Sequence, residues 1–539
     1  MVVVAIAIPQ PVVAPLIPIV VRMPMKRRRS VTTVFPATLL LLAGGLVVAA
    51  PDASAVEAGA AEAMFTSFNN AFLVRSGGDT YYKAALNDGK PDGTWAGSLD
   101  ILGAEDAYEQ TGDPARKTLV NDLLTTWLRK NPPPWSWDGW NDDIGWFSLA
   151  LIRGYQITGN ATFLTQARYG FDYAFGRGWD TQYNGGGIWE ENPEYAAREN
   201  PPREPAKEPL SNDSLGKVAV LIYQSTHDTS YLAKARQIYD WVWNHLYNPA
   251  TGQVYARIDR SGTIDRGAAA YNQGTFADFA NLIHESTGDT NVYNDAKKAI
   301  DYARTDLTTN GVFSNSANYL NTWADEMARG AGHFVRDNRQ WDTYYSWMVQ
   351  NADAIQAHRR SDLGITWNAW TQNTPADNSL TANKFVSALA WLQYTPASRP
   401  SDIGGIHVVT NQKTGLAIDS SGTYGNGQNV IQWGANNGQN QRWLFTRNSD
   451  NSWNIVNLAT WQALDCPAGS AQDGTSLVQW QPTRSGNQRW WVDQQPDGSY
   501  KIWNQQGGAA LDGASATVDG APLVQWGWNG GGQQRWVLR

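Results

Sequence analysis

The residues best suited to chemistry are two consecutive aspartates, Asp142 and Asp143, in a tryptophan-rich segment that includes Trp140 and Trp146. The apolar run over residues 144–152 predicts a helix that is buried on all sides. Because a proline-rich loop precedes this run, the two carboxylates should lie at the N-terminal end of the helix. Adjacent carboxylates there would be roughly 5 Å apart, the separation that a retaining glycosidase needs between its nucleophile and its acid/base.

Position and repulsion should give these two acids different protonation states. The helix dipole favours a negative charge at the N-terminus, whereas repulsion between the carboxylates raises the pKa of one of them, which can then act as an acid. Two alternatives stay open at this point. The pair could simply cap an exposed helix start, and a second acidic pair, Asp325-Glu326, is a rival catalytic site.

Composition excludes several other classes of function. The 539 residues include 42 Lys and Arg against 50 Asp and Glu, so the net charge is −8, and the absence of a basic stripe argues against a nucleic-acid partner. One cysteine and six histidines that never recur at helical spacing predict no disulfide framework, metal or cofactor. The 27 tryptophans suit stacking on sugars, although an aromatic-rich core would also account for them.

The first 55 residues read as an export segment. Met25 begins a basic stretch, an apolar run follows over residues 37–50, and Ala53-Ser54-Ala55 fits a cleavage site. We therefore expect a true start at Met25, a signal of the Sec or twin-arginine type, and a secreted protein. Because no later stretch of 18 apolar residues occurs, the mature chain should contain no membrane segment.

Residues 56–395 are predicted to form helical hairpins. Similar helix-stop sequences recur at Gly112-Asp113, Gly159-Asn160, His227-Asp228 and Gly288-Asp289. A glycine after a helix supplies a left-handed C-cap, and the acidic or amide residue after it caps the next helix. Repeated hairpins predict either an open solenoid or a closed toroid, and the long loops rich in Trp, Gly and Pro favour the toroid.

After a short linker, residues 396–402, the composition changes. Residues 401–539 contain no Glu and only two Lys, which argues against helices. Three motifs recur there at intervals of 46 or 47 residues, among them Gln432-Trp433 and Asn440-Gln-Arg-Trp443. Three β-rich units of this size should pack around a pseudo-threefold axis, so residues 403–539 are predicted to form an all-β domain.

These repeats resemble the ricin-type β-trefoil lectins (carbohydrate-binding module family 13). The resemblance implies a sugar site in each repeat, formed by an Asp, an aromatic platform and an amide: Asp419, Trp433 and Asn440; Asp465, Trp480 and Asn487; Asp512, Trp526 and Gln533. Gln533 departs from the usual Asn. The tryptophan of each Gln-Arg-Trp motif should lie in the core. Members of this family often have a disulfide in each repeat, whereas this region has Cys466 alone.

The segment from Asn141 to Tyr155 is similar to the Asp-Asp-x-x-Trp segment of glycoside hydrolase family 76, the endo-α-1,6-mannanases, and three later segments match in order. The resemblance implies an (α/α)6 toroid with Asp142 as nucleophile and Asp143 as acid/base. It also suggests substrate-binding residues along the cleft: Trp140, Trp146, Trp189, Asn212, Tyr271 and Gln273. A proline-rich insertion from Asn192 to Pro209, after Glu190-Glu191, is a departure that leaves the chain-length preference open.

The sequence therefore predicts a multidomain protein, an all-α (α/α)6 toroid followed by an all-β trefoil. The expected function is that of a secreted, retaining endo-α-1,6-mannanase that cleaves α-mannan and binds cell-wall glycans through its lectin domain. We expect a monomer. Two alternatives stay open: a transglycosidase that uses the same dyad, and a non-catalytic glycan-binding protein.

Overall fold

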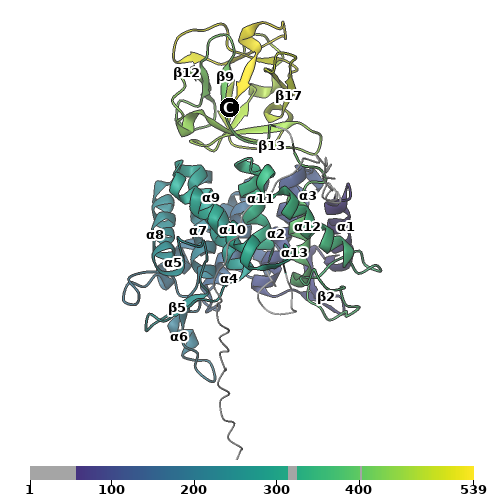
Figure 1. Ribbon diagram of the computed structural model, residues 1–539, viewed down its shortest axis with the longest axis vertical. Helices are drawn as coiled ribbons and strands as arrows, with labels where there is room; N and C mark the ends of the chain where they lie inside the picture. The colour runs from purple at the N-terminus through teal and green to yellow at the C-terminus, as the bar shows by residue number, and fades with distance from the viewer. Residues whose placement is uncertain (1–55, 314–323, 401–402) are drawn as a thin grey trace, which may run out of the picture. The chain divides into compact units, whose positions relative to one another are not determined.

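The computed structural model describes residues 56–313, 324–400 and 403–539 (Figure 1). The predicted export segment, residues 1–55, lies outside the described residues, as do the last two residues of the predicted linker. Helices make up most of the chain as far as Tyr394, and strands dominate from Gly405 onward. Within the described ranges, no helix has the length and apolar character needed to cross a membrane.

Six described helices form a closed inner ring: α2 (Thr94–Thr111), α4 (Asn141–Thr158), α7 (Pro209–Thr226), α9 (Ala270–Thr287), α11 (Ala324–Asp337) and α13 (Asn383–Tyr394). Each packs against the next, and α13 packs against α2. Six more surround them: α1 (Ala60–Phe72), α3 (Pro114–Lys130), α5 (Ala161–Gly178), α8 (Thr229–Leu246), α10 (Thr290–Asp306) and α12 (Trp341–Ala357). The predicted (α/α)6 toroid is confirmed, and the open solenoid is excluded.

The recurring helix stops end four of the inner helices, as predicted. The residue after each helix is left-handed, with φ of 61° at Gly112, 75° at Gly159, 59° at His227 and 76° at Gly288. The following residue then caps the outer helix, since its side chain accepts a hydrogen bond from a backbone N–H in the first turn. These short sequences therefore set the turn from each of four inner helices to its outer partner.

The inner helices are buried on nearly all sides, and α9 and α11 approach each other most closely at two glycines. A Cβ atom added to Gly274 would lie 2.3 Å from the backbone of Met327, and one added to Gly330 would lie 2.4 Å from the carbonyl oxygen of Gly274. Only glycine permits this backbone contact. The two helices are thereby held at a separation that any side chain would increase.

Short strands occur in the loops between helices. One sheet contains β1 (Leu73–Ser76), β2 (Asp79–Ala85) and β3 (Asp88–Pro91). A second joins β4 (Ala206–Lys207), β5 (Arg257–Asp259) and β6 (Ile264–Asp265), and a third pairs β7 (Thr308–Thr309) with β8 (Val312–Phe313). The short helix α6 (Pro193–Ala196) lies in the insertion noted in the sequence. The second sheet ties the end of this insertion to the loop before α9.

The C-terminal domain is built from antiparallel strands: β9 (Gly405–Asn411), β10 (Ala417–Asp419), β11 (Gln428–Asn429), β12 (Ile431–Trp433), β13 (Arg442–Arg447), β14 (Trp453–Asn457), β15 (Ala463–Asp465), β16 (Val478–Trp480), β17 (Trp490–Gln494), β18 (Tyr500–Asn504), β19 (Ala510–Asp512), β20 (Ala521–Pro522), β21 (Val524–Trp526) and β22 (Trp536–Leu538). Its apolar core is a cluster separate from that of the toroid.

Equivalent residues hold the three repeats of this β-trefoil together. The tryptophans of the Gln-Arg-Trp motifs, Trp443, Trp490 and Trp536, are fully buried, as predicted. Each indole N–H donates to a backbone carbonyl at 3.0–3.1 Å. Three buried glutamines link the repeats in a cycle, because the side-chain amide of each donates to a carbonyl of another repeat: Gln432 to Gly513, Gln479 to Ser420 and Gln525 to Ser470.

Two glycine substitutions should affect stability in opposite directions. Gly274→Ala places a methyl group against the backbone of α11 and should destabilise the toroid by about 1–3 kcal/mol or more, as overpacking does. Gly176→Ala, inside α5 and facing open space, should stabilise it by roughly 0.5–1 kcal/mol. Urea unfolding followed by circular dichroism measures both. Equal effects would mean that the close approach of α9 and α11 does not constrain the fold.

Candidate active site

Asp142 and Asp143 lie in the first turn of α4, where the sequence places them, and both line a cavity of about 660 Å³. Asn141 fixes this helix start. Its backbone N–H donates to the carbonyl of Glu190 at 2.7 Å, and its side-chain oxygen accepts from Arg177 at 2.7 Å. The start of α4 is therefore tied to the following loop, and the two carboxylates face into the cleft.

The environment of the pair favours retention of protons. Burial raises the pKa of Asp142 well above its usual range, and the negative charges of Asp143, Glu190 and Glu208 raise it further. Burial and the charges of Asp138 and Glu190 raise the pKa of Asp143 to about 8, against an opposing hydrogen bond from Thr94. Because neither acid loses its proton as readily as a free aspartic acid, the dyad holds at least one proton at neutral pH.

A second carboxyl pair lies beside the dyad. Glu190 and Glu208 share a hydrogen bond, and burial together with the charge of Glu190 raises the pKa of Glu208 to about 9. Arg203 donates to Glu190 at 2.8 Å and partly offsets this negative charge. Glu190, Glu208 and Arg203 all line the same cleft as Asp142. Sequence reasoning singled out Glu190 only as part of a departure from the family pattern and missed its pairing with Glu208.

The rival acidic pair, Asp325-Glu326, has a different environment. Arg329 contacts Asp325 at 2.7 Å and Glu326 at 2.6 Å, and Lys217 contacts Glu326 at 2.7 Å. Burial opposes ionisation, but the charges of Lys217 and Arg329 together lower the pKa of Glu326. Glu326 is also among the residues that line the cleft. Burial still raises the pKa of Asp325 to about 6, but both acids are held in ion pairs, so the geometry favours Asp142 and Asp143 as the reactive pair.

The predicted substrate-binding residues divide into two groups. Trp140, Trp146 and Tyr271 line the cleft with the dyad. The side chains of Trp189, Asn212 and Gln273 do not, and all three are buried. Aromatic and polar side chains in these loops suit either role, and the sequence does not distinguish them.

Those three residues brace loops around the cleft. Asn212 accepts from the backbone N–H of Ile188 at 2.8 Å and donates to the carbonyl of Glu208 at 2.7 Å. Gln273 donates to two backbone carbonyls at 2.9 and 3.0 Å and accepts from a third backbone group. Trp189 donates to Asp180 at 3.0 Å. Buried amides and indoles satisfy otherwise unpaired loop groups, so these three side chains support the loops around the cleft.

The cleft continues into an open groove of about 400 Å³. Trp140 and Asp143 line both spaces, so we call the enclosed part the inner cleft and the open part the outer groove. Trp137, half exposed, lies in the outer groove. It was missed as a candidate although it belongs to the same tryptophan-rich segment as Trp140. A linear chain could thus extend on both sides of Asp143.

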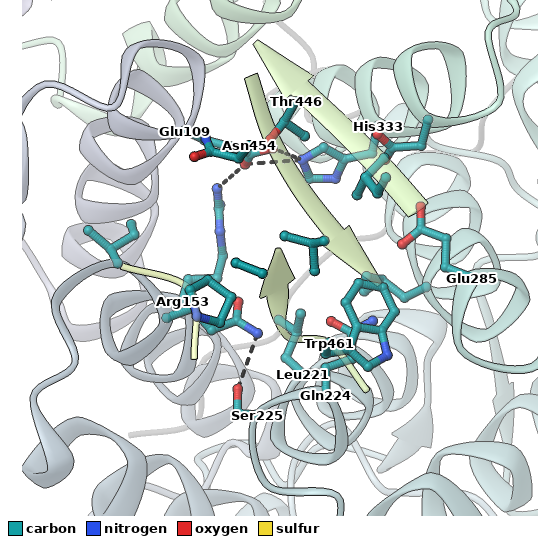
Figure 2. A pocket seen from close by; sticks show the side chains of 18 of the residues that line it. Glu109, Arg153, Leu221, Gln224, Ser225, Glu285, His333, Thr446, Asn454 and Trp461 are labelled. Atoms are coloured by element: carbon teal, nitrogen blue, oxygen red, sulfur yellow. Dashed lines mark hydrogen bonds and ion pairs between the residues drawn. The ribbon is translucent and has the colours of Figure 1, made fainter. Parts of the chain in front are cut away.

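The opposite ends of the inner helices carry a separate charged network (Figure 2). Glu109 accepts from Arg153 at 3.0 Å and contacts His333 at 3.2 Å. Burial alone would lower the pKa of His333, but the charges of Glu109 and Asp278 raise it to about 10. Arg153 is 11 residues beyond Asp142 on α4, which is about 16 Å along the helix. This network is remote from the dyad and stabilises the far end of the ring.

The predicted sugar sites of the trefoil share one arrangement in two repeats. Trp433, Trp480 and Trp526 are exposed by 42, 43 and 44%. Asp419 accepts from Asn440 at 2.7 Å, and Asp465 accepts from Asn487 at 2.8 Å. In the third repeat, the side-chain amide of Gln533 donates to Asn529 at 3.3 Å rather than to Asp512. The third site therefore lacks the amide contact that the other two have.

Comparisons with protein families agree with this division of the chain. Residues 79–396 match glycosyl hydrolase family 76, and residues 392–480 match the ricin-type β-trefoil lectin domain-like family. A comparison with curated proteins found no match. Because the first match covers more than half of the chain, this protein belongs to glycosyl hydrolase family 76, and it carries a ricin-type lectin domain after the catalytic one.

Solved structures share the toroid fold. The GH76A α-1,6-mannanase from Salegentibacter sp. HEL1_6 is 22% identical, with a TM-score of 0.55, over 62% of this chain and 98% of that chain. A protein of Listeria innocua is 19% identical, with a TM-score of 0.55, over 62% of this chain and 95% of that one. A GH76 α-mannanase of Bacteroides thetaiotaomicron is 15% identical, with a TM-score of 0.52, over 63% and 94%.

The pKa of Asp143 predicts an alkaline limit of activity. An acid with a raised pKa is protonated below that value, so kcat/KM should fall as the pH rises through about 8. Asp138→Asn removes a negative charge that raises this pKa, and the limit should therefore move to lower pH. Rates of glycan cleavage from pH 5 to 10 measure it. Asp172→Asn, on the surface of α5, is the control; an unmoved limit in Asp138→Asn would contradict the assignment.

Proposed function

We propose that this family 76 protein is a secreted, retaining endo-α-1,6-mannanase that hydrolyses the backbone of cell-wall mannan. The observation that carries the proposal is the acid pair at the start of α4, which lies in a cleft lined by aromatic side chains and is surrounded by further carboxylates. Two neighbouring carboxyl groups, one ionised and one protonated, are what a double-displacement glycosidase requires.

In the proposed mechanism, the two acids act on opposite sides of the glycosidic bond. The Asp142 carboxylate attacks the anomeric carbon, while Asp143 gives its proton to the leaving oxygen, so that a covalent glycosyl–Asp142 ester forms and the glycosidic bond breaks. Asp143, now ionised, takes a proton from water. The water oxygen then attacks the anomeric carbon, and Asp142 leaves as a carboxylate. The helix N-terminus stabilises the negative charge on Asp142 before attack.

Structural neighbours support the choice of substrate. One is the Salegentibacter α-1,6-mannanase, and another structure of the same enzyme is an inactive variant, with two consecutive aspartates replaced by asparagine, in complex with α-1,6-mannotriose. The present dyad is also a pair of consecutive aspartates. Trp140, Trp146 and Tyr271 offer aromatic surfaces for sugar rings in the cleft.

The open groove supports cleavage within a chain. Trp137 and Tyr195 line the outer groove on one side of Asp143, and the inner cleft lies on the other. An endo-acting enzyme must hold sugars on both sides of the scissile bond. Residues 1–55 would direct the protein out of the cell, and we propose that it acts there as a monomer.

The trefoil would keep the enzyme on polymeric glycan. In each repeat an exposed tryptophan and a buried aspartate lie on two paired strands, which suits stacking on a sugar ring together with hydrogen bonds to its hydroxyl groups. Several weak sites on one molecule raise its effective concentration on a polymer. We propose that the sites of Asp419 and Asp465 bind cell-wall glycans and that the site of Asp512 contributes least.

Substitution of either acid should abolish most of the activity without unfolding the protein. Asp142→Asn and Asp143→Asn should each lose at least about 10²-fold in kcat, because the first removes the nucleophile and the second removes the general acid. Only Asp143→Asn should recover on aryl mannosides with a good leaving group, which needs no proton. Activity lost in Asp325→Asn but kept in Asp142→Asn would place the chemistry elsewhere.

A substrate comparison separates this proposal from its alternatives. The full chain is incubated with linear α-1,6-mannan, α-1,4-glucan and cellulose, and reducing ends and product lengths are followed. New reducing ends from mannan alone support the proposal. Products longer than the substrate added would indicate a transglycosidase, and binding to mannan without cleavage would indicate a glycan-binding protein.

The three sugar sites are best compared through their tryptophans, because Asp419 and Asp465 are buried and accept hydrogen bonds that their removal would leave unpaired. In the full chain, Trp433→Ala and Trp480→Ala should each weaken binding to insoluble mannan roughly several-fold, and Trp526→Ala should weaken it least. Sedimentation with the polymer measures this. Cleavage of short soluble oligosaccharides is the control and should not change; equal losses at all three sites would contradict the ranking.

A further inference from the structure

We propose that the trefoil has a fourth glycan-binding surface, formed by Trp491, Trp503 and Trp528, in addition to the three predicted sugar sites. We call it the tryptophan face. It goes beyond the proposed function, because none of its residues belongs to a predicted site. All three tryptophans are partly exposed. The apolar core of the trefoil, as far as the structure describes it, neither includes them nor packs against them.

The register of β17 and β18 brings two of these tryptophans together. Trp491 pairs with Trp503 across the strands, and their ring centroids are 6.0 Å apart at an interplanar angle of 35°. Side chains alternate between the two faces of a strand, and the neighbouring residues Val492 and Ile502 belong to the core or pack against it. Trp491 and Trp503 therefore lie side by side on the outer face of the hairpin.

Trp528 joins this pair through Lys501. The ammonium nitrogen of Lys501 lies 4.6 Å from the ring centroid of Trp503 and 5.3 Å from that of Trp528, and both are cation–π contacts. Trp528 follows β21, two residues after the exposed Trp526, so it comes from a different part of the chain. The three indoles therefore form one cluster at the surface.

The threefold repeat shows that packing does not require these tryptophans. The strand pair equivalent to Trp491 and Trp503 carries no aromatic residue in either of the other two repeats, where it is Leu444 with Val456 and Val537 with Thr410. The positions equivalent to Trp528 hold Ala435 and Pro482. Since the other repeats pack without them, three partly exposed indoles gathered at one place are better explained by a ligand.

The polar groups beside the indoles suit an uncharged sugar. Asp493 pairs with Lys501 across the strands, and its carboxylate accepts a hydrogen bond from the indole N–H of Trp503 at 2.7 Å. Among the described residues, the ammonium of Lys501 makes no hydrogen bond or ion pair, so its N–H groups can donate to hydroxyls, and the carboxylate can accept from them. Because the two charges are opposite, the surface favours the neutral rings of a polysaccharide over a charged glycan.

The test measures binding of the full chain to insoluble α-1,6-mannan and to cellulose by sedimentation. In the background protein, Asp142→Asn prevents cleavage, and three substitutions disable the predicted sites: Trp433→Ala, Trp480→Ala and Trp526→Ala. Trp491→Ala and Trp503→Ala are then added one at a time. Val537→Ala is the matched control, because Val537 holds the position of Trp491 in another repeat. Circular dichroism checks the fold, and size-exclusion chromatography reports self-association.

We expect the background protein to keep measurable binding to at least one polymer. Trp491→Ala and Trp503→Ala should each weaken that binding about three- to tenfold, because each removes a stacking surface, and Val537→Ala should leave it unchanged. The choice of mannan as a probe rests on the proposed function, whereas cellulose does not. A wild type that cleaves no mannan would contradict the proposed function alone.

Four results would overturn the inference. The first is a background protein that binds neither polymer, and the second is binding that stays the same in both folded tryptophan variants. The third is binding that high salt abolishes, because charge pairing rather than stacking on a neutral sugar would then be responsible. The fourth is a change of elution volume in Trp491→Ala, since the tryptophan face would then be a contact between copies of the chain.

Discussion

The chemistry of this toroid depends on which buried acids have a cation beside them. Arg329 and Lys217 neutralise Asp325 and Glu326 on the inner helices. The groups that raise the pKa of Asp142 are instead other carboxylates, and burial acts in the same direction. A buried pair of carboxyl groups without a counter-charge keeps at least one proton at neutral pH. The same ring therefore contains ionised acids held in ion pairs and a pair of acids that retains a proton, which it could donate.

The geometry of α4 reconciles this proton retention with the need for a nucleophile. Both aspartates lie in the first turn, where unpaired backbone N–H groups favour negative charge. Once one of the two aspartates is ionised, its negative charge raises the pKa of the other. The pair can therefore carry one negative charge while the second acid keeps its proton. Asn141 and its contact with Glu190 fix the helix start. A shift of one residue in that start would turn the pair away from the cleft, and the local fold is therefore part of the proposed catalytic arrangement.

Much of the toroid and the position of the dyad could be predicted from sequence, because both depend on local signals. The left-handed residues after four helices and the caps that follow them are short motifs, and the apolar run after Asp143 identifies an inner helix. The roles of Trp189, Asn212 and Gln273 could not be predicted, because a polar or aromatic side chain in a loop serves equally well to bind sugar or to satisfy buried backbone groups. Only the folded loops show which backbone groups need a partner. The Glu190–Glu208 pair was missed for a related reason, since an insertion separates the two residues in sequence.

The trefoil shows why scaffold and site can diverge within one repeat. The buried tryptophan and glutamine of the third repeat, Trp536 and Gln525, make the same contacts as their counterparts. Its predicted sugar site nevertheless lacks the amide contact to the aspartate, here Asp512, that the other two have, since Gln533 donates to Asn529. The residues that close the threefold core are different from those predicted to bind sugar, so a change at the surface leaves the packing intact. A repeat can therefore keep its structural role after its site has weakened, and the strength of each sugar site must be judged from its own contacts rather than from the symmetry of the fold.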